Sequence, residues 1–347
     1  MQKINTALLS FGMSGWVFHA PFITLDPHFA LTAVWERSKK LVAEKYPGIT
    51  SYQTLDELLN DDTIELVIVN TPNYTHYEYS KKALLAGKNI VVEKPFTVTV
   101  DEGEELIALA KEKKLMISVY QNRRYDSDFK TIKKILDEGS LGEIVEAEFQ
   151  FMRYSEQIGP KIHKEQPGPG TGSLYDLGSH LIDQALQLFG MPKAIFADIQ
   201  ILRPVSMVDD YFELLLFYDK LRVRLRSTYL AREIPPGYII HGSKGSFLKA
   251  KTNVQEEALA AGKTPDDPEW GTEPESERGL LHTEINGKVI REHITSERGN
   301  YSQYYIAIYE ALRNGAAPPV SAEDGLNVIR IIQKAYESNQ KKCVVNV

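Results

Sequence analysis

Three side chains that can exchange protons or bind a metal ion lie close together in the sequence. Residues 172–183 read GSLYDLGSHLID, which places Asp176, His180 and Asp183 at i, i+4 and i+7. On a helix these three side chains share a face. Two carboxylates and an imidazole on one face could bind a metal ion, transfer a proton in an enzyme, or cap and solvate the helix. The spacing alone leaves all three possibilities open.

A lysine follows directly after a buried strand pattern in the segment IVVEKP, residues 90–95. A lysine in that position is ordinarily a surface charge. Ligands of open α/β sheets, however, bind outside the carboxyl ends of the strands, where Lys94 is expected to lie. Pro95 restricts the backbone of Lys94 to extended conformations. An ammonium group held there could polarise a substrate oxygen or, if desolvated, titrate near neutral pH.

The first 121 residues alternate strand and helix patterns. Apolar strand patterns cover residues 4–11, 29–36, 64–70, 89–93 and 115–121, and helix patterns fall between them. A Thr54–Glu57 capping box marks the start of one short helix. Repeated strand–helix units of this length predict a parallel sheet covered by helices on both faces. We therefore expect an α/β, doubly wound domain over residues 1–121.

From residue 122 the pattern changes. Period-2 alternation between residues 144 and 250 predicts a large, mostly antiparallel sheet with one covered face. Helix patterns occur at residues 129–138, 304–314 and 324–339, and the Pro- and Gly-rich stretch 262–279 is expected to be a surface loop. Residues 122–347 are therefore expected to form a second, α+β domain.

The first strand pattern runs into Ser10-Phe11-Gly12-Met13-Ser14-Gly15. The dinucleotide-binding fingerprint has glycine at the positions of Ser10, Gly12 and Gly15. Gly12 would let the backbone approach a pyrophosphate, and Gly15 would let the following helix pack closely on the strand. Two glycines of three make a weak motif, but its place between a first strand and a first helix favours nucleotide binding. The first candidate cofactor-binding residues are therefore Ser10, Gly12, Met13, Ser14 and Gly15.

The residues after the second strand pattern, Glu36-Arg37-Ser38, give conflicting signals about the cofactor. An acid at Glu36 suits the 2′-hydroxyl of NAD. Arg37 and Ser38 suit the 2′-phosphate of NADP, because a guanidinium group pairs bidentately with phosphate. Since Glu36 could turn outward and leave the phosphate to its neighbours, we favour NADP over NAD. A solvated helix start is compatible with either cofactor.

Polar side chains also follow the strand pattern at residues 64–70. This segment offers hydroxyl and amide groups at the same edge of the predicted sheet as Lys94. Such groups would suit the nicotinamide ribose. The candidate cofactor-binding residues at these two strand ends are Thr71, Pro72, Asn73, His76, Glu93 and Lys94.

Composition narrows the class of protein. The 347 residues are 43% hydrophobic and carry a net charge of −7, from 40 basic and 47 acidic residues. This acidic balance argues against nucleic acid or an anionic membrane as the main partner, since both reward a basic face. No window approaches 18 uninterrupted apolar residues, the first residues lack the pattern of a signal peptide, and Cys343 is a lone cysteine. We therefore expect a cytoplasmic protein in a reducing environment.

Taken in order, four of these features resemble the glucose–fructose oxidoreductase / inositol dehydrogenase / rhizopine-catabolism (Gfo/Idh/MocA) family. They are the glycine motif, Thr71-Pro72 with His76, Glu93-Lys94-Pro95, and GSLYDLGSH at residues 172–180. The resemblance covers essentially the whole chain, including GSKGSF at residues 242–247. Within the family, SVYQNRRYDSDF, LYDLGSHLIDQ, LFGMPKA and GLNVIRII look most like bacterial NADP-dependent scyllo-inositol dehydrogenase-like enzymes.

The resemblance implies an N-terminal Rossmann domain and a C-terminal α+β domain whose open sheet often forms a subunit interface, so a homodimer or homotetramer is expected. It also implies NAD(P)-linked oxidation of a secondary alcohol on a cyclic polyol or sugar, or the reverse reduction. By motif position, Lys94 is the lysine of the Glu-Lys-Pro motif, and Asp176 and His180 are the acid and the histidine of the second motif. Ser10 departs from the usual glycine, and Glu36 departs from the neutral residue expected with NADP.

Hydride transfer from a carbinol carbon requires that the hydroxyl proton leave as well. A histidine suits this task near neutral pH, so we expect His180 to be the acid/base, Lys94 to stabilise the oxyanion, and Asp176 to orient the imidazole or bind a substrate hydroxyl. Asp176 could instead cap its helix, and the two arginines after residue 122 could merely pair with acids. A metal site is the least favoured interpretation, because no Cys or further His cluster accompanies the stretch. The candidate substrate contacts are Arg123, Arg124, Tyr154, Asp176 and His180.

Two other functions are compatible with the same fold. An NAD-dependent glycoside hydrolase oxidises its substrate only transiently and would release free sugar without net turnover of the cofactor. A non-enzymatic NAD(P)-binding regulatory protein could dispense with both Lys94 and His180. The presence of both residues therefore favours an enzyme.

Overall fold

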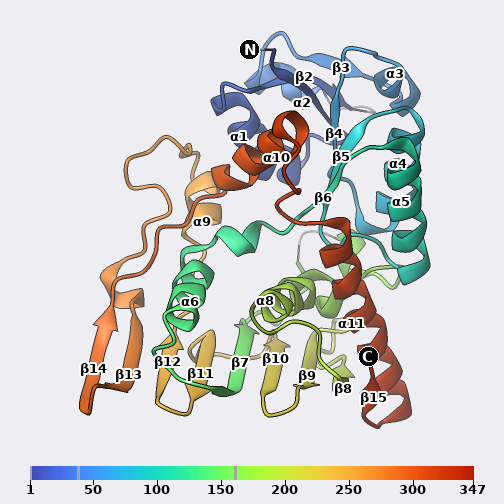
Figure 1. Cartoon of the computed structure of the whole chain (residues 1–347). Helices are drawn as coiled ribbons and strands as arrows, with labels where there is room; N and C mark the ends of the chain where they lie inside the picture. The colour runs from blue at the N-terminus through green and yellow to red at the C-terminus, as the bar shows by residue number, and fades with distance from the viewer. Residues whose placement is uncertain (1, 37–39, 160–161) are drawn as a thin grey trace. The chain divides into compact units, whose positions relative to one another are not determined.

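The computed structural model describes residues 2–36, 40–159 and 162–347 (Figure 1). The chain folds into two compact units, and each contains segments that are far apart in the sequence. Unit 1 comprises Met1–Asn122, Gln255–Trp270 and Asn300–Leu326, and unit 2 comprises Arg123–Val254, Gly271–Gly299 and Asn327–Val347.

The core of unit 1 is a six-stranded parallel sheet with the order β3-β2-β1-β4-β5-β6. Apart from the edge strand β3 its strands are mostly buried, as expected when helices cover both faces. The strand order changes direction between β1 and β4, and doubly wound folds bind their ligands outside the carboxyl ends of strands at such a point. The structure therefore confirms the predicted doubly wound domain. The strands are β1 (Ile4–Leu8), β2 (Phe29–Trp35), β3 (Thr50–Tyr52), β4 (Leu66–Val69), β5 (Asn89–Glu93) and β6 (Ile117–Tyr120).

Helices connect the strands of unit 1. The predicted capping box is confirmed at α3, where the Thr54 hydroxyl accepts a hydrogen bond from the Glu57 amide at 3.2 Å and the Glu57 carboxylate accepts one from the Thr54 amide at 3.0 Å. A second capping box, Thr99 with Glu102, begins α5. The helices are η1 (Ser14–His19, π-helical), α1 (Ala20–Leu25), α2 (Leu41–Lys45), α3 (Leu55–Leu59), η2 (Asn73–Thr75), α4 (His76–Leu85) and α5 (Val100–Lys113).

Two late segments of the chain complete the core of unit 1. They carry most of α9 (Val254–Ala260), all of α10 (Ser302–Asn314) and the start of α11 (Ala322–Lys341). The sequence predicts one contiguous second domain over residues 122–347, whereas these segments pack into unit 1. The difference arises because aromatic burial joins segments that are distant in the sequence. The aromatic residues concerned are Phe22, Phe29, Tyr120, Trp270, Tyr301, Tyr304 and Tyr305.

Unit 2 is built on a nine-stranded sheet with the order β14-β13-β12-β11-β7-β10-β9-β8-β15. Strands β7 and β10 pair in parallel and the other neighbours are antiparallel, which confirms the predicted mostly antiparallel sheet. The predicted strands end at residue 250 and omit β13 and β14, although the Asn286-Gly287 pair between them, with positive φ at both residues, is a strong hairpin signal. The strands are β7 (Ile144–Met152), β8 (Ala194–Gln200), β9 (Tyr211–Phe217), β10 (Arg222–Thr228), β11 (Tyr238–Gly242), β12 (Gly245–Lys249), β13 (Gly279–Ile285), β14 (Lys288–Ile294) and β15 (Val345–Asn346).

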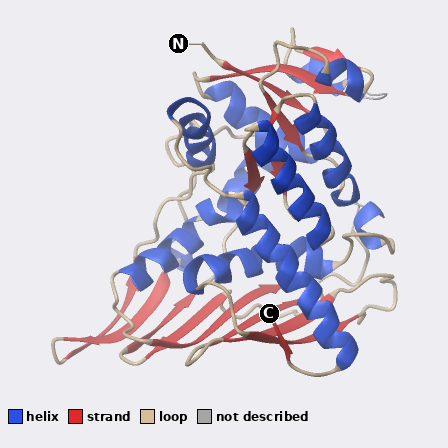
Figure 2. Cartoon of the chain, turned by 45° about the vertical axis from the view of Figure 1, so that its right-hand side comes forward, coloured by secondary structure: helices blue, strands red, loops and turns tan. Residues whose placement is uncertain are grey.

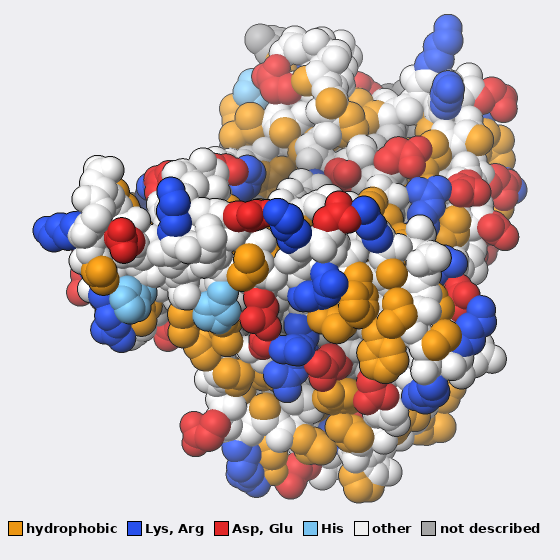
Figure 3. Space-filling model, turned by 60° about the horizontal axis from the view of Figure 1, so that its bottom comes forward, with side chains coloured by type: hydrophobic (Ala, Val, Ile, Leu, Met, Phe, Trp, Pro, Cys, Tyr) orange, Lys and Arg blue, Asp and Glu red, His pale blue; other side chains and the backbone are white. Residues whose placement is uncertain are grey.

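Helices lie over one face of this sheet (Figure 2). The inward residues of β9 and β10 are buried and, apart from Ser227, apolar, whereas Arg222, Arg224 and Arg226 occupy alternate positions of β10. Figure 3 shows basic, acidic and hydrophobic side chains intermingled on the face turned to the viewer. Across residues 2–36, 40–159 and 162–347, no helix combines the length and the apolarity needed to cross a bilayer. The helices of unit 2 are η3 (Asn122–Tyr125), α6 (Ser127–Asp137), α7 (Ile162–Glu165), η4 (Leu174–Gly178, π-helical), α8 (Ser179–Phe189), η5 (Glu275–Glu277) and the rest of α11.

Candidate active site

The glycine turn after β1 is held by an asparagine from the end of β4. The Ser10 amide donates to Asn70 Oδ1 at 3.0 Å, and Asn70 Nδ2 donates to the Ser10 carbonyl at 2.8 Å. The Ser10 hydroxyl in turn accepts a hydrogen bond from the Gly12 amide at 3.2 Å. Serine in place of the first glycine therefore adds a hydrogen bond within the turn.

The two glycines of the turn meet different surroundings. A Cβ at Gly15 would clash with the carbonyl oxygen of Ser10, so only glycine lets the helix start this close to the strand. A Cβ at Gly12 would meet only the Ser10 hydroxyl, at 3.5 Å. The space beside Gly12 is therefore available to a ligand, as the fingerprint requires. Met13, next to it, is 38% exposed.

Glu36, at the end of β2, is turned into the protein, and the outward orientation considered from the sequence is not observed. The residue is 8% exposed, and its carboxylate accepts hydrogen bonds from the Leu41 amide at 2.8 Å and the Ser51 hydroxyl at 3.1 Å. These contacts hold the start of α2 and strand β3. Arg37 and Ser38, the other two candidates for reading the ribose, lie outside the described residues.

His76 connects the ends of β4 and β5. Its Nδ1 lies 2.8 Å from the Pro95 carbonyl and its Nε2 lies 2.9 Å from the Thr71 carbonyl. Burial lowers the pKa of His76, although the two carbonyls favour the protonated ring. The imidazole is thus engaged by the backbone and fixes the two loops. Pro72 and Asn73, also predicted to contact the cofactor, lie at the start of η2, in the segment between β4 and α4.

Glu93, the acid of the Glu-Lys-Pro motif, is 13% exposed and is the centre of a hydrogen-bonded chain. Ser14 Oγ donates to its Oε1 at 2.5 Å, and His19 Nε2 lies 3.1 Å from the same oxygen. His19 Nδ1 lies 2.6 Å from the Tyr305 hydroxyl of α10. The Lys94 amide donates to Glu93 Oε2 at 3.2 Å. The glycine turn and the strand end that bears Lys94 are therefore directly bonded.

The protonation states in this hydrogen-bonded chain around Glu93 follow from the surroundings of each group. Burial by itself would raise the pKa of Glu93, but the hydrogen bond and charge of His19, the Ser14 hydroxyl and the charge of Lys94 bring it down to about 2. Burial raises the pKa of Tyr305 well above its usual value, so its hydroxyl keeps its proton. His19 is absent from the predicted site; its place at the end of the helix that opens at the glycine turn is the one signal for it.

In unit 2, the segment of Asp176 and His180 begins with a π-helical turn that continues into α8. His180 is buried, with 5% exposure. Asp176 lies inside the π-helical turn and caps neither helix, since the cap positions belong to Ser173 and Gly178. Its Oδ1 accepts a hydrogen bond from Lys164 Nζ at 2.6 Å. Lys164, on the short helix α7, is absent from the predicted site.

The predicted arginines have acidic partners. Arg124 donates two hydrogen bonds to Asp183, at 2.8 and 2.6 Å, and this pair is buried. Arg123 donates from Nη1 to Asp126 at 3.1 Å and to Asn253 at 3.0 Å. Asp183, which follows Asp176 and His180 in the 172–183 stretch, therefore forms an ion pair with Arg124.

The remaining predicted substrate contact, Tyr154, is 37% exposed. Its hydroxyl donates to Glu156 at 2.7 Å and accepts from Arg232 at 2.5 Å. Among the described residues, no group of three His, Cys, Asp or Glu side chains could hold a metal ion.

Replacing Glu93 with Gln should make the free energy of unfolding depend less on pH in the acidic range. The carboxyl has a pKa of about 2 in the folded protein against 4.5 ordinarily, so its contribution is present above pH 4.5 and lost as the pH falls from 4.5 towards 2. That difference corresponds to about 3 kcal/mol. We expect Glu93→Gln to be less stable than wild type at pH 7, with the gap narrowing at pH 3, by urea unfolding. Glu44→Gln, at an exposed position of α2, is the control; a gap that is the same at both pH values would contradict the assignment.

Two family models match the chain. "Oxidoreductase family, NAD-binding Rossmann fold" matches residues 4–121, and "Oxidoreductase family, C-terminal alpha/beta domain" matches residues 133–347; both are Gfo/Idh/MocA models.

Known proteins are similar over the whole length. The scyllo-inositol 2-dehydrogenase (NADP(+)) IolW of Bacillus subtilis is 42% identical over 99% of this chain and 95% of that protein. The crystal structure of an oxidoreductase from Bacteroides fragilis shares 51% identity and a TM-score of 0.92 over 100% of both chains. That of the oxidoreductase yvaA from Bacillus subtilis shares 41% identity and a TM-score of 0.95, over 100% of this chain and 99% of that chain. The chain belongs to the Gfo/Idh/MocA family of oxidoreductases, and residues 4–121 are its NAD-binding Rossmann domain.

Proposed function

We propose that the protein transfers hydride between NADP and a secondary alcohol of a cyclic polyol or sugar. The observation that carries the proposal is the 2.5 Å hydrogen bond from Ser14 to Glu93, because it joins the glycine turn to the strand end that bears Lys94. A dinucleotide at the turn would then have an ammonium group at the same edge of the sheet. The similarity to a protein named as an NADP-dependent scyllo-inositol 2-dehydrogenase supports the substrate class.

The choice of NADP rests on Glu36. Its carboxylate is occupied by the Leu41 amide and the Ser51 hydroxyl, so it is a poor acceptor for the 2′-hydroxyl of NAD. Burying it also keeps a negative charge away from a 2′-phosphate. Arg37 and Ser38 follow it in the sequence and supply the donors that a phosphate needs.

Replacing Arg37 with Ala should weaken the binding of NADPH at least tenfold and leave the binding of NADH nearly unchanged. A hydrogen bond to a charged group contributes about 1.5–3 kcal/mol, and only NADPH has the 2′-phosphate. Dissociation constants from fluorescence titration measure both. Lys3→Ala removes an exposed positive charge just before β1, at the opposite end of the sheet, and is the control. An equal loss for the two dinucleotides would overturn the choice of NADP.

The proposed reaction gives each residue one task. The bound nicotinamide supplies the hydride acceptor or donor. In the oxidation, the imidazole of His180 takes the proton of the substrate hydroxyl, and the ammonium of Lys94 stabilises the negative charge that develops on the oxygen. Asp176, held by Lys164 at 2.6 Å, orients the imidazole or binds a neighbouring hydroxyl. In the reduction the proton moves in the opposite direction.

Lys94→Ala and His180→Ala should each lower kcat by about 10²- to 10⁴-fold, the usual contribution of a positioned acid–base group. Binding of NADPH should persist in the His180 variant, since unit 1 is untouched. The assay is the reduction of NADP with inositols, aldoses and lactones as substrates. Lys193→Ala and His293→Ala, at exposed positions, are the matched controls.

Two outcomes would overturn this mechanism. Turnover that survives both substitutions unchanged would show that other residues move the proton. Release of free sugar from a glycoside without net change in NADPH would assign the protein to glycoside hydrolysis instead.

We also propose that the outward face of the nine-stranded sheet binds the same face of a second copy. Phe196 of β8 lies opposite Leu215 of β9, Leu215 opposite Arg224 of β10, and Arg224 opposite Glu148 of β7. Arg224 is paired with Glu148 and Glu213, so the row combines apolar side chains with ion-paired ones. Such a row suits a self-complementary interface around a two-fold axis.

Leu215→Asp should convert the oligomer into single chains, because it would bury an unpaired charge in the interface. Light scattering after size exclusion measures the molar mass. Leu85→Asp, at a 57% exposed position on α4 of unit 1, should leave the mass unchanged. A wild-type protein with the mass of one chain would contradict the proposal.

A further inference from the structure

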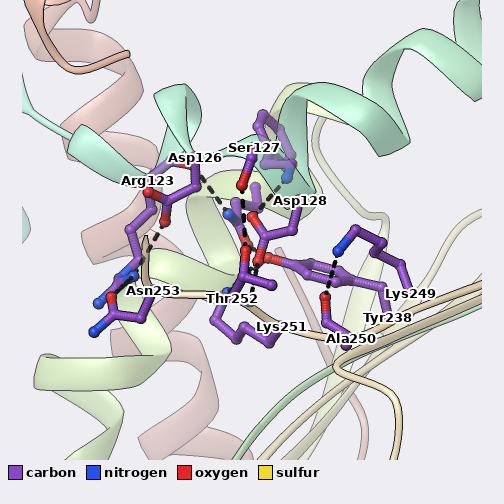
Figure 4. Close-up of polar contacts among 12 residues, drawn as sticks. Arg123, Asp126, Ser127, Asp128, Tyr238, Lys249, Ala250, Lys251, Thr252 and Asn253 are labelled. Atoms are coloured by element: carbon purple, nitrogen blue, oxygen red, sulfur yellow. Dashed lines mark hydrogen bonds and ion pairs between the residues drawn. The ribbon is translucent and has the colours of Figure 1, made fainter. Parts of the chain in front are cut away.

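A pocket in unit 2 is lined by charged side chains that the proposed hydride and proton transfers do not use. Its volume is about 190 Å³. Its walls are residues 150–153 at the end of β7, residues 234, 235 and 237 before β11, and residues 251–253 after β12, with Arg123 beside them. Figure 4 shows Arg123 and Lys251 with their polar partners at the start of α6.

Three cationic groups surround one aromatic ring in this pocket. The guanidinium carbons of Arg123 and Arg153 lie 5.3 and 4.8 Å from the centre of the Phe151 ring, and Lys251 Nζ lies 4.8 Å from it. The ring attracts each cation, but the cations repel one another. An anion among them would relieve that repulsion.

The acids that compensate these cations lie behind the pocket wall. Asp126 pairs with Arg123 at 3.1 Å, and Asp128 Oδ2 lies 3.9 Å from Lys251 Nζ. Neither carboxylate lines the pocket, and their side chains are 4% and 0% exposed. Glu273, which accepts a hydrogen bond from Thr252, is paired with Lys249 at 2.7 Å, so this pair adds one charge of each sign. The three cations at the ring against the two aspartates therefore leave a surplus of one positive charge. One negative charge would therefore complete the balance, whereas a phosphate dianion would exceed it.

Lys251 is the member of the cluster that can lose its charge. Its side chain is 11% exposed, and its Nζ donates to the Tyr238 hydroxyl at 2.6 Å. Burial lowers the pKa of Lys251 to about 8; Asp128 and Asp126 oppose the shift, and Arg123 and Arg153 add to it. Tyr238 keeps its proton, because burial raises its pKa. The charged and hydroxyl groups around the Lys251 ammonium come from η3, the start of α6, the end of β7, and β11.

The groups around the pocket are hydrogen-bonded to α8, the helix that bears His180. Gln184 lies one turn further along α8, and its Oε1 accepts a hydrogen bond from the Tyr238 hydroxyl at 3.1 Å. Gln184 Nε2 donates to the Arg123 carbonyl at 3.3 Å. A side chain on the same face of α8 as His180 is thus hydrogen-bonded to Tyr238, the partner of Lys251, and to the backbone of Arg123.

We propose that this pocket binds a single carboxylate group on the substrate, so that the preferred substrate is a sugar acid or polyol acid. The inference rests on the proposed function, which places the reacting hydroxyl at His180. Guanidinium and ammonium groups bind carboxylates by charge-assisted hydrogen bonds, and Asn253 on the pocket wall adds an amide donor. The matched probes are glucuronate and glucose, which differ by a carboxylate in place of a hydroxymethyl group.

In calorimetric titrations of the NADPH complex at pH 7, glucuronate should bind at least tenfold more tightly than glucose. Lys251→Met should abolish this preference, and Arg153→Gln, at an exposed position that does not affect the core, should reduce it. Lys220→Met, in the exposed turn between β9 and β10, should leave it unchanged. For the wild type, the affinity for glucuronate should fall as the pH rises through 8, where Lys251 loses its proton, and this fall should be absent in Lys251→Met.

Equal binding of glucuronate and glucose, or a preference that survives both substitutions, would overturn the inference. Tighter binding of inorganic phosphate than of glucuronate at the same residues would also overturn it, since a dianion exceeds the charge surplus. Glucuronate that binds through Lys251 but is never oxidised, while no other sugar or polyol is oxidised either, would support the carboxylate site and refute the proposed function.

Discussion

A carboxylate removed from water must find its hydrogen bonds and its counter-charge within the protein, and Glu93 finds them in separate segments of unit 1. Ser14 comes from the glycine turn, His19 from the end of the helix that follows it, and the Lys94 amide from the next residue along the chain. Losing any one of them would leave a buried charge incompletely compensated, which costs several kcal/mol. The position of the glycine turn and the position of Lys94 are therefore fixed by the same group.

This constraint also explains why unit 1 is not contiguous in sequence. The second ring nitrogen of His19 is bonded to the hydroxyl of Tyr305, which lies on α10 nearly two hundred residues beyond the last strand of the sheet. A fragment ending at residue 121 would keep the strands and the glycine turn but would leave the His19 ring without this partner and its aromatic neighbours exposed. Unit 1 therefore depends on a segment of the chain that the C-terminal family model covers.

The sequence predicts what depends on local patterns. Buried strands, the Thr54 capping box and the lysine at the end of β5 are each set by a few neighbouring residues, and the glycine turn and the motif containing His180 could be located in the same way. The partners of these groups could not be predicted, because hydrogen bonds such as that from Lys164 to Asp176 or from Arg123 to Asn253 depend on how separate segments pack. The β13–β14 hairpin is a different case, because its Asn-Gly turn is a local signal. The hairpin is missed because the strands of unit 2 are predicted only from the alternation pattern, which ends at residue 250.

Two clusters of buried charge, one in each unit, differ in what their cations face. Around Glu93 the hydrogen-bond donors and the positive charges are directed at one carboxylate, which holds the glycine turn and the end of β5 in place. Around Phe151 the two carboxylates fall one short of the three cations, and the surplus faces a pocket instead of the core. Donors and cations that converge on one carboxylate can fix a geometry, whereas a cluster whose surplus positive charge faces a pocket gains stability when an anion enters. For that reason the group that the cations of a buried cluster face, more than the number of hydrogen bonds, separates a cluster that supports a site from a cluster that selects its ligand.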